Sequence, residues 1–202
     1  MNIFRFLLYV SVMLIITYLQ QEFVLLPELQ NLDIVGEASR AQILDRWQKM
    51  RWLAFVLAPV LLLLRLSLVT LCLFLGGFFF STMSGWKYRD WWEIALKAQA
   101  VMLFYSVVLC IISLTMGSNQ ALAVTKYSSL LFLGSDNMES WISIPLAAIN
   151  GFEVAYWLVM AGLIRVKTNN TYKTSLRFVL SSYGVGYLFY LVFLMFLVLY
   201  IS

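Results

Sequence analysis

The sequence predicts an all-α integral membrane protein, a bundle of helices that crosses the bilayer five, or alternatively six, times. Three observations lead to this prediction. The chain of 202 residues is 62% hydrophobic and only 12% charged, whereas soluble domains carry about 25% charged residues. Its mean hydropathy is +0.86. Its apolar residues form runs long enough to span a bilayer and leave little polar sequence, so residues 1–202 are expected to form one membrane domain.

Four of the apolar runs have about the 17 to 25 residues that a membrane helix needs. They cover residues 3–19, 98–116, 141–164 and 178–201. A fifth run, 52–84, is long for one crossing and short for two, and it contains Pro59 and Arg65. We expect one long tilted helix here, which gives five crossings. The alternative is a hairpin with Arg65 at its outer turn, which gives six.

Two shorter features complete the N-terminal half. The run 3–19 has the apolar character of a signal-peptide core, but Gln20, Gln21 and Glu22 follow it in place of a small-residue cleavage site. We therefore expect it to remain as a membrane span. Residues 41–50 carry apolar side chains along one helical face, which predicts an interfacial helix leading into the next span.

Basic residues orient the loops, because cytoplasmic loops are enriched in Lys and Arg. Residues 165–177 contain four of them and residues 87–97 contain three, whereas residues 117–140 contain only Lys126. The first two segments are predicted to be cytoplasmic and the third to be outside, so the C-terminus is expected outside. This distribution accounts for the net charge of +4, and no nucleic-acid partner is expected.

The residue inventory excludes much catalytic chemistry. The chain contains no histidine, which excludes catalytic triads, histidine-ligated metals and histidine proton relays. Cys72 and Cys110 lie in separate apolar runs without the spacing of a metal or redox site. No phosphate-binding loop, dinucleotide fingerprint or nucleophile elbow is present. We expect no catalytic residue, no metal and no cofactor.

Glu153 is the residue most indicative of function. It lies near the middle of the run 141–164, and an acidic side chain at a bilayer centre costs about 3 kcal/mol. Asn150, three positions earlier, shares its helical face. Arg65 is the only other charge deep within an apolar run, and Gln99 and Tyr183 are further polar candidates near the ends of spans. Glu153 is expected to serve either as a hydrogen-bonded packing element or as a proton or ion site.

Small residues predict where helices pack closely. Within the run 141–164 they recur every four residues, at Ser143, Ala147, Gly151 and Ala155. Such a ladder lets a second membrane helix approach. Gly184 and Gly186, near the start of the last span, are also expected to be packing positions rather than parts of a ligand site.

Three segments carry a resemblance to a known family. They are residues 92–100 (Trp-Glu-Ile-Ala-Leu-Lys-Ala-Gln-Ala), 144–157 (Ile-Pro-Leu-Ala-Ala-Ile-Asn-Gly-Phe-Glu-Val-Ala-Tyr-Trp) and 181–186 (Ser-Ser-Tyr-Gly-Val-Gly). In these the chain resembles the Yip1-like membrane domain and small bacterial multi-span proteins. The resemblance implies a helical membrane adaptor that binds partner proteins, and it places the chain in a bacterial inner membrane. It implies no catalytic residue.

The function expected from the sequence is that of a non-enzymatic accessory or scaffold subunit of a larger membrane complex. Its partners would be the lipid bilayer and other membrane proteins, or further copies of the same chain. The alternative is a small transporter or channel component in which Glu153 and Asn150 line a path, with Arg65 as counter-charge. An intramembrane enzyme would need more polar groups around Glu153 than the sequence indicates.

Overall fold

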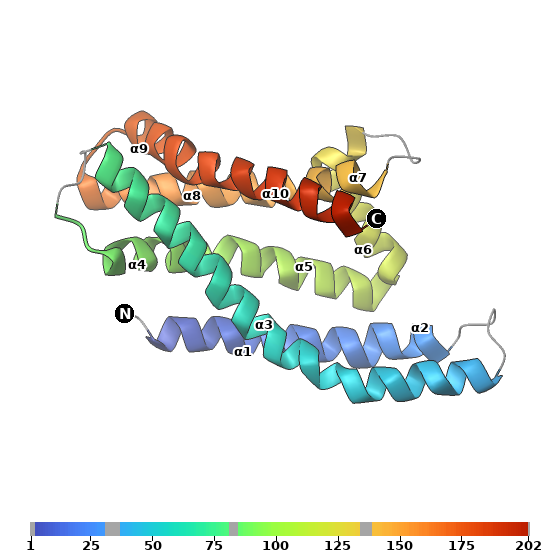
Figure 1. Ribbon diagram of the computed structural model, residues 1–202. Helices are drawn as coiled ribbons and strands as arrows, with labels where there is room; N and C mark the ends of the chain where they lie inside the picture. The colour runs from blue at the N-terminus through green and yellow to red at the C-terminus, as the bar shows by residue number, and fades with distance from the viewer. Residues whose placement is uncertain (1–2, 31–36, 81–84, 134–138, 202) are drawn as a thin grey trace. The chain divides into compact units, whose positions relative to one another are not determined.

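The computed structural model describes residues 3–30, 37–80, 85–133 and 139–201. These residues are almost entirely helical, and they contain no β-strand (Figure 1). The elements are α1 (Ile3–Gln20), η1 (Gln21–Leu25), α2 (Leu26–Gln30), α3 (Glu37–Phe79), α4 (Tyr88–Ala98), α5 (Ala100–Met116), α6 (Ser118–Ser128), η2 (Leu130–Leu133), α7 (Ser140–Ala148), α8 (Gly151–Thr168), α9 (Tyr172–Val179), η3 (Leu180–Gly184) and α10 (Val185–Ile201). The all-α prediction is confirmed.

The number of membrane helices differs from the prediction. Among the described residues, four helices are long and apolar enough to cross a membrane: Ile3–Leu25, Gln42–Phe79, Tyr88–Met116 and Tyr172–Tyr200. The expected number was five or six. The predicted spans 3–19 and 98–116 fall within two of these helices, and the span 178–201 coincides with a third as far as Tyr200. Each helix extends beyond the apolar run at its polar end.

The run 52–84 forms one helix rather than a hairpin. Helix α3 continues without a break from Glu37 to Phe79, and both Pro59 and Arg65 lie inside it. A proline removes one hydrogen bond and can kink a helix, but apolar surroundings favour keeping all the remaining backbone bonds within the helix. The predicted six-crossing hairpin is therefore not formed. Residues 81–84, at the end of the predicted span, lie outside the described residues.

The predicted span 141–164 is interrupted at its centre. Helix α7 ends at Ala148, Ile149 and Asn150 have extended backbone conformations, and α8 starts at Gly151. Asparagine favours such an interruption because its side chain can bond backbone N–H groups at a helix start. The ladder of small residues is consequently divided, with Ser143 and Ala147 on α7, and Gly151 and Ala155 on α8.

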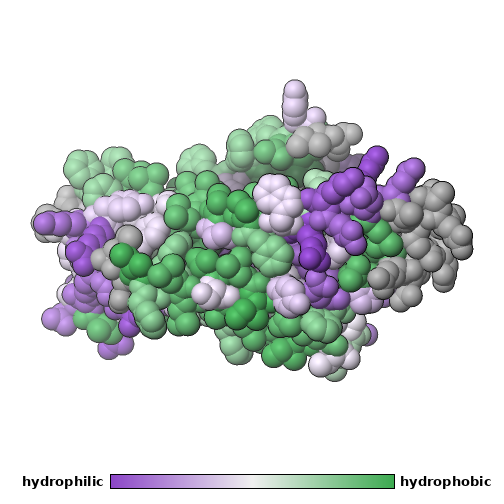
Figure 2. All heavy atoms as spheres, turned by 90° about the horizontal axis from the view of Figure 1, so that it is seen from below, coloured by the Kyte–Doolittle hydropathy of each residue, from purple (hydrophilic) through white to green (hydrophobic). Residues whose placement is uncertain are grey.

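The described residues fall into two compact units. Unit 2 contains residues 3–64 and 103–122. At one end of this unit, Arg51 on α3 forms an ion pair with Glu22 at 2.8 Å, and its carbonyl accepts a hydrogen bond from Gln21. Apolar side chains of α1 are exposed or half-buried, and Ile16 is the only described residue of this helix that is buried within the chain. Apolar side chains cover most of the surface that faces the viewer in Figure 2.

Unit 1 contains residues 65–102 and 123–201 and has the better-packed core. Its fully buried side chains include Leu66 and Leu73 of α3, Trp91 and Leu96 of α4, and Met160 of α8. The stack of Trp91 on Phe178, with ring centroids 5.3 Å apart, connects α4 to α9. Burial of aromatic rings of this size contributes strongly to holding helices together.

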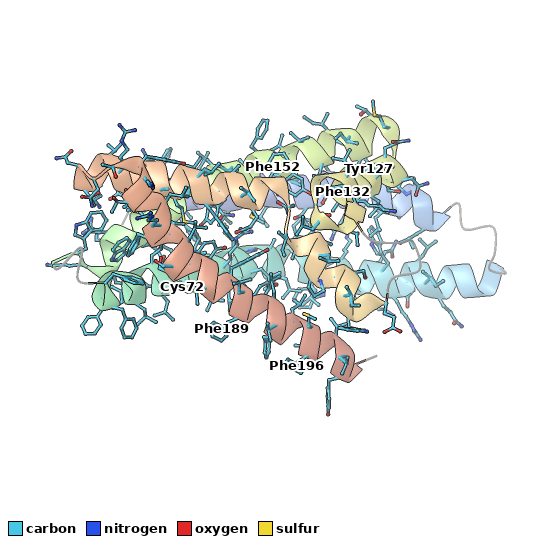
Figure 3. The ribbon with its side chains drawn as sticks, turned by 90° about the horizontal axis from the view of Figure 1, so that it is seen from above. Cys72, Tyr127, Phe132, Phe152, Phe189 and Phe196 are labelled. Carbon is cyan, nitrogen blue, oxygen red and sulfur yellow. The ribbon has the colours of Figure 1, made fainter. Side chains whose placement is uncertain are left out.

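The closest helix contact in unit 1 joins α3 to the η3–α10 segment. A Cβ atom added to Gly76 would overlap the side chain of Ser182, and one added to Gly186 would overlap that of Cys72. Cys72 and Gly76 are four residues apart, as are Ser182 and Gly186, so two small-xxx-small pairs face each other. We call these four residues the α3–α10 seam. Cys72 lies beside α10 in Figure 3, whereas Phe189 and Phe196 point away from the unit.

Candidate functional site

The interruption between α7 and α8 positions Glu153. The side-chain oxygen of Asn150 accepts a hydrogen bond from the backbone N–H of Glu153 at 2.8 Å, which makes Asn150 the N-cap of α8. The carbonyl of Ile149, released from helical bonding, accepts a hydrogen bond from the Leu130 N–H at 2.9 Å. Glu153 therefore lies in the first turn of α8, where the helix dipole favours a negative charge.

Both carboxylate oxygens of Glu153 are bonded to donors from three different elements. Oε2 accepts from the guanidinium of Arg65 on α3 at 2.7 Å. Oε1 accepts from the hydroxyl of Tyr183 in η3 at 2.7 Å and from the indole N–H of Trp157 on α8 at 3.0 Å. The carboxylate is 3% exposed. These bonds supply the pairing that a buried charge requires.

Arg65 reaches the site from a position 88 residues earlier in the chain. Its guanidinium carbon lies 5.3 Å from the centre of the Tyr156 ring, a cation–π contact. Tyr156 is fully buried, and its hydroxyl has no hydrogen-bond partner among the described residues. The positive charge of Arg65 thus contacts both the Glu153 carboxylate and an aromatic ring.

One π-helical segment and two tyrosines of the Tyr172–Tyr200 helix complete the surroundings. Tyr183 lies in the π-helical segment η3, and such a local widening changes the direction in which side chains project. Its ring packs edge-on against Tyr156 and Trp157. One turn later, the hydroxyl of Tyr187 donates to the carbonyl of Ala148 at 2.7 Å and so satisfies the end of α7. The same helix therefore supports both sides of the α7–α8 interruption.

The site lies deep in the apolar part of its helix. The midpoint of Tyr172–Tyr200 is residue 186, and Tyr183 lies three residues from it, which is about 4.5 Å along a helix. If this helix is centred on a bilayer with a hydrocarbon core of about 30 Å, the Arg65–Glu153 pair lies near the membrane midplane. Water is scarce at that depth, so the two charges can be accommodated only when Arg65 and Glu153 are paired.

The structure brings together four of the five predicted polar candidates: Glu153, Asn150, Arg65 and Tyr183. Gln99 lies apart from them at the junction of α4 and α5, where it is buried and its amide oxygen has no partner among the described residues. Sequence reasoning missed Trp157 and Tyr187. Trp157 could have been found, because it lies four positions after Glu153 on the same helical face. For Tyr187 the sequence contains no comparable signal.

The predicted packing residues have different surroundings. A Cβ atom added to Gly186 would overlap Cys72, so this position requires a small residue. At Gly184 it would make ordinary contact with Trp157 at 3.8 Å, and at Gly151 it would meet only the Ser128 carbonyl, at 3.7 Å. Gly151 is exposed. Close packing within unit 1 therefore depends on the α3–α10 seam, and Gly151 is available to a partner outside the chain.

Among the described residues, no group of three or more His, Cys, Asp or Glu side chains could hold a metal ion. Chemically, the Glu153 cluster is a charge-paired and hydrogen-bonded junction between α3, α8 and η3.

No protein-family model matches this chain, and no curated protein or solved structure shows detectable similarity to it. The Yip1-like resemblance therefore stays a prediction.

Proposed function

We propose that this protein is a non-enzymatic accessory or scaffold subunit of a larger complex in a bacterial inner membrane. The observation that carries the proposal is the bonding of Glu153. Both of its oxygens are occupied by donors of the same chain, from α3, α8 and η3. A carboxylate used in turnover needs an open position for its substrate or proton, whereas one used for architecture needs each lone pair engaged.

Exposed apolar surface supports an assembly role. Ile16 is the only described residue of α1 that is buried within the chain, and Phe189 and Phe196 on α10 are 73% and 70% exposed. Part of such a surface contacts lipid in any membrane protein. Partner helices would account for the rest, because small residues and apolar faces are what membrane helices pack together.

Gly151 offers a direct test of assembly. It is exposed and has only one neighbouring atom near its Cβ position, so the chain itself can accommodate Gly151→Leu. We expect this variant to fold but to lose most of the chains that co-purify with the wild type in mild detergent, as quantified by mass spectrometry. Val159→Phe adds bulk to a different, exposed face of α8 and is the control. Glu153→Gln should disturb assembly less than Gly151→Leu.

Two results would refute the scaffold proposal. One is Gly151→Leu protein that retains every native association in amounts equal to the wild type. The other is wild-type protein, extracted from its native host, that is a monomer with no stoichiometric partner.

The interrupted helix supports a second candidate, a small transporter or channel component. Broken membrane helices line the binding sites of many transporters, and here the break at Ile149 and Asn150 is directly beside Glu153. This function predicts that Glu153→Gln abolishes flux in proteoliposomes while assembly is retained. Wild-type protein that is inert under imposed proton and ion gradients would count against it.

A further inference from the structure

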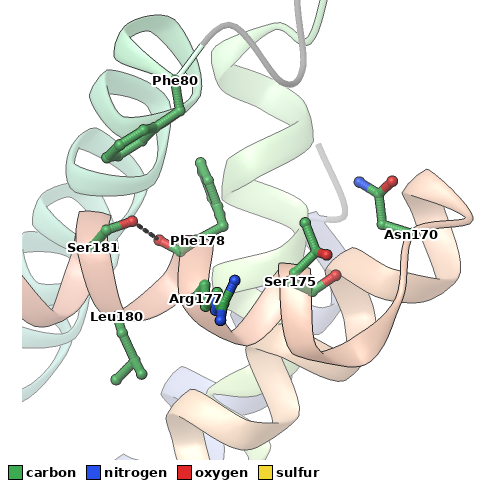
Figure 4. A pocket seen from close by; sticks show the side chains of 8 residues that line it. Phe80, Asn170, Ser175, Arg177, Phe178, Leu180 and Ser181 are labelled. Atoms are coloured by element: carbon green, nitrogen blue, oxygen red, sulfur yellow. Dashed lines mark hydrogen bonds between the residues drawn. The ribbon is translucent and has the colours of Figure 1, made fainter.

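A second polar feature of unit 1 lies near the start of the Tyr172–Tyr200 helix, and its lining residues are distinct from those that bond Glu153. It is a pocket with a volume of about 560 Å³ (Figure 4). Phe80, from the end of α3, and Phe178, on α9, lie edge to face in its wall, with ring centroids 6.4 Å apart. Ser175 and Arg177 line the same pocket. One pocket thus combines an apolar wall with a cation and a hydroxyl.

The depth of the pocket matches the boundary between headgroups and acyl chains. Arg177 precedes the helix midpoint, residue 186, by nine residues, which is about 13 Å along a helix. The hydrocarbon core extends about 15 Å from the bilayer centre. Phe178 and Leu180 lie on the hydrocarbon side of Arg177, and Ser175 lies on the headgroup side. The order of polar and apolar groups is therefore that of a phospholipid.

Ser175 has an unmet hydrogen bond at this position. The residue is 1% exposed, and its hydroxyl has no partner among the described residues. Buried hydroxyls in proteins nearly always have a partner. The neighbouring Ser181 differs, because its hydroxyl donates to the Phe178 carbonyl at 3.1 Å. A phosphate oxygen in the pocket would provide Ser175 with the acceptor that the chain does not.

Charge complementarity favours an anion. Residues 165–177 contain four basic and no acidic residues, and among the described residues Arg177 enters no ion pair. The acidic side chains described in unit 1 are engaged elsewhere: Asp90 with Lys167, Glu93 with Lys97, Glu153 with Arg65, and Glu139 with the Trp141 indole. Among the described residues, no acidic side chain therefore compensates the positive charge of Arg177.

We propose that this pocket binds an anionic phospholipid. Its phosphate lies against the Arg177 guanidinium and the Ser175 hydroxyl, and one acyl chain lies along Phe80 and Phe178. Arginine suits this role because its planar fork can donate two hydrogen bonds to one phosphate. The proposal does not depend on the assembly function, because the pocket shares no residue with the Glu153 site or with Gly151.

Native mass spectrometry of the full chain in mild detergent tests the proposal. The protein is titrated with phosphatidylglycerol or with phosphatidylcholine of the same acyl chains. We expect Arg177→Gln to weaken phosphatidylglycerol binding about tenfold, the scale of one charged hydrogen bond. Arg165→Gln removes the same charge from an exposed residue that does not line the pocket, and it should leave binding within about twofold.

A second pair of variants tests the hydroxyl. Ser175→Ala removes an unpaired hydroxyl, so the fold should be unaffected while phosphatidylglycerol binding weakens. Ser181→Ala, in the same pocket, should leave binding unchanged because that hydroxyl is already bonded to the chain.

Three results would overturn the proposal. They are equal binding of the two lipids, equal losses in Arg177→Gln and Arg165→Gln, and binding of inorganic phosphate with the affinity of the lipid. The first two would indicate a general attraction of the surface for lipid, and the third would assign the pocket to a free anion.

Discussion

Glu153 is a buried charged residue in the first turn of α8, and its environment determines what that charge does. An isolated acidic side chain at a bilayer centre costs about 3 kcal/mol. Here the Arg65 guanidinium, the Tyr183 hydroxyl and the Trp157 indole replace the missing water. As in other buried ion pairs, removing one charged partner is expected to destabilise the protein more than removing both, because the remaining charge is left unpaired.

Glu153→Gln is therefore expected to destabilise the protein by about 3 kcal/mol, at the lower end of the effect of breaking a buried pair, because Arg65 is partly exposed. The double variant Arg65→Gln/Glu153→Gln should be more stable than Glu153→Gln alone. Thermal unfolding in detergent, followed by loss of monodisperse protein on size exclusion, measures both.

Glu93→Gln is the matched control for this change. Glu93 forms an exposed pair with Lys97 at 2.8 Å, four residues away on the same helix. Exposed pairs of this kind contribute about 0.3 to 0.5 kcal/mol, so stability should change little. Losses in the double variant equal to the sum of the two single variants would show that Arg65 and Glu153 are not energetically coupled.

Among the helices, small residues determine which pairs can approach closely. The sequence predicts close packing along the ladder from Ser143 to Ala155, but the interruption at Asn150 divides that ladder between two helices. The closest approach instead involves Gly76 and Ser182, on α3 and η3. This contact holds the end of α3 against the helix that carries Tyr183, and it thereby supports the geometry of the Glu153 site.

Gly76→Ala should destabilise the protein by about 2 kcal/mol, because its Cβ would overlap that of Ser182 and well-packed contacts resist added methyl groups. Ser182→Gly removes the opposing Cβ, so the double variant Gly76→Ala/Ser182→Gly should recover most of that loss. Melting temperatures in detergent provide the comparison.

Gly162→Ala provides the contrasting case. Gly162 lies within α8, and nothing approaches its Cβ position within 4 Å. An alanine there should be neutral or should stabilise the helix by about 0.5 to 1 kcal/mol. If Gly76→Ala behaved in the same way as Gly162→Ala, the α3–α10 seam would not be a tight contact.

At the scale of the whole molecule, the two basic segments of unit 1 lie next to each other. Lys167, at the end of α8, bonds Asp90 on α4 at 3.0 Å, so the segments 87–97 and 165–177 meet at one end of this unit. Both were assigned to the cytoplasmic side from their Lys and Arg content. Glu139, before the start of α7, is separated from the end of α8 in the chain by both helices.

Cysteine labelling tests this orientation. In a background with Cys72→Ala and Cys110→Ala, we expect Arg89→Cys and Lys173→Cys to react with an impermeant maleimide only after the cytoplasmic face is opened. Glu139→Cys should react in intact cells. All three positions are exposed. Reaction of Lys173→Cys and Glu139→Cys from the same side would contradict the predicted orientation.

The sequence by itself determined the all-α fold and the presence of apolar helices long enough to cross a membrane, and it indicated Glu153 as a candidate site residue. Each of these depends on local composition: long apolar runs and one acid within them. The sequence also indicated Arg65 and Tyr183 as candidates.

Only the tertiary structure decided that Arg65, 88 residues away, pairs with Glu153, that Tyr187 supports the end of α7, and that Gly76 meets Ser182. Contacts between distant segments depend on how helices are aligned, and apolar periodicity does not specify that alignment in a chain whose helices are hydrophobic on most faces. The interruption at Asn150 has both a local and a tertiary cause. Locally, asparagine favours a helix start. In the tertiary structure, the Leu130 N–H, from another segment, donates to the Ile149 carbonyl that the interruption releases.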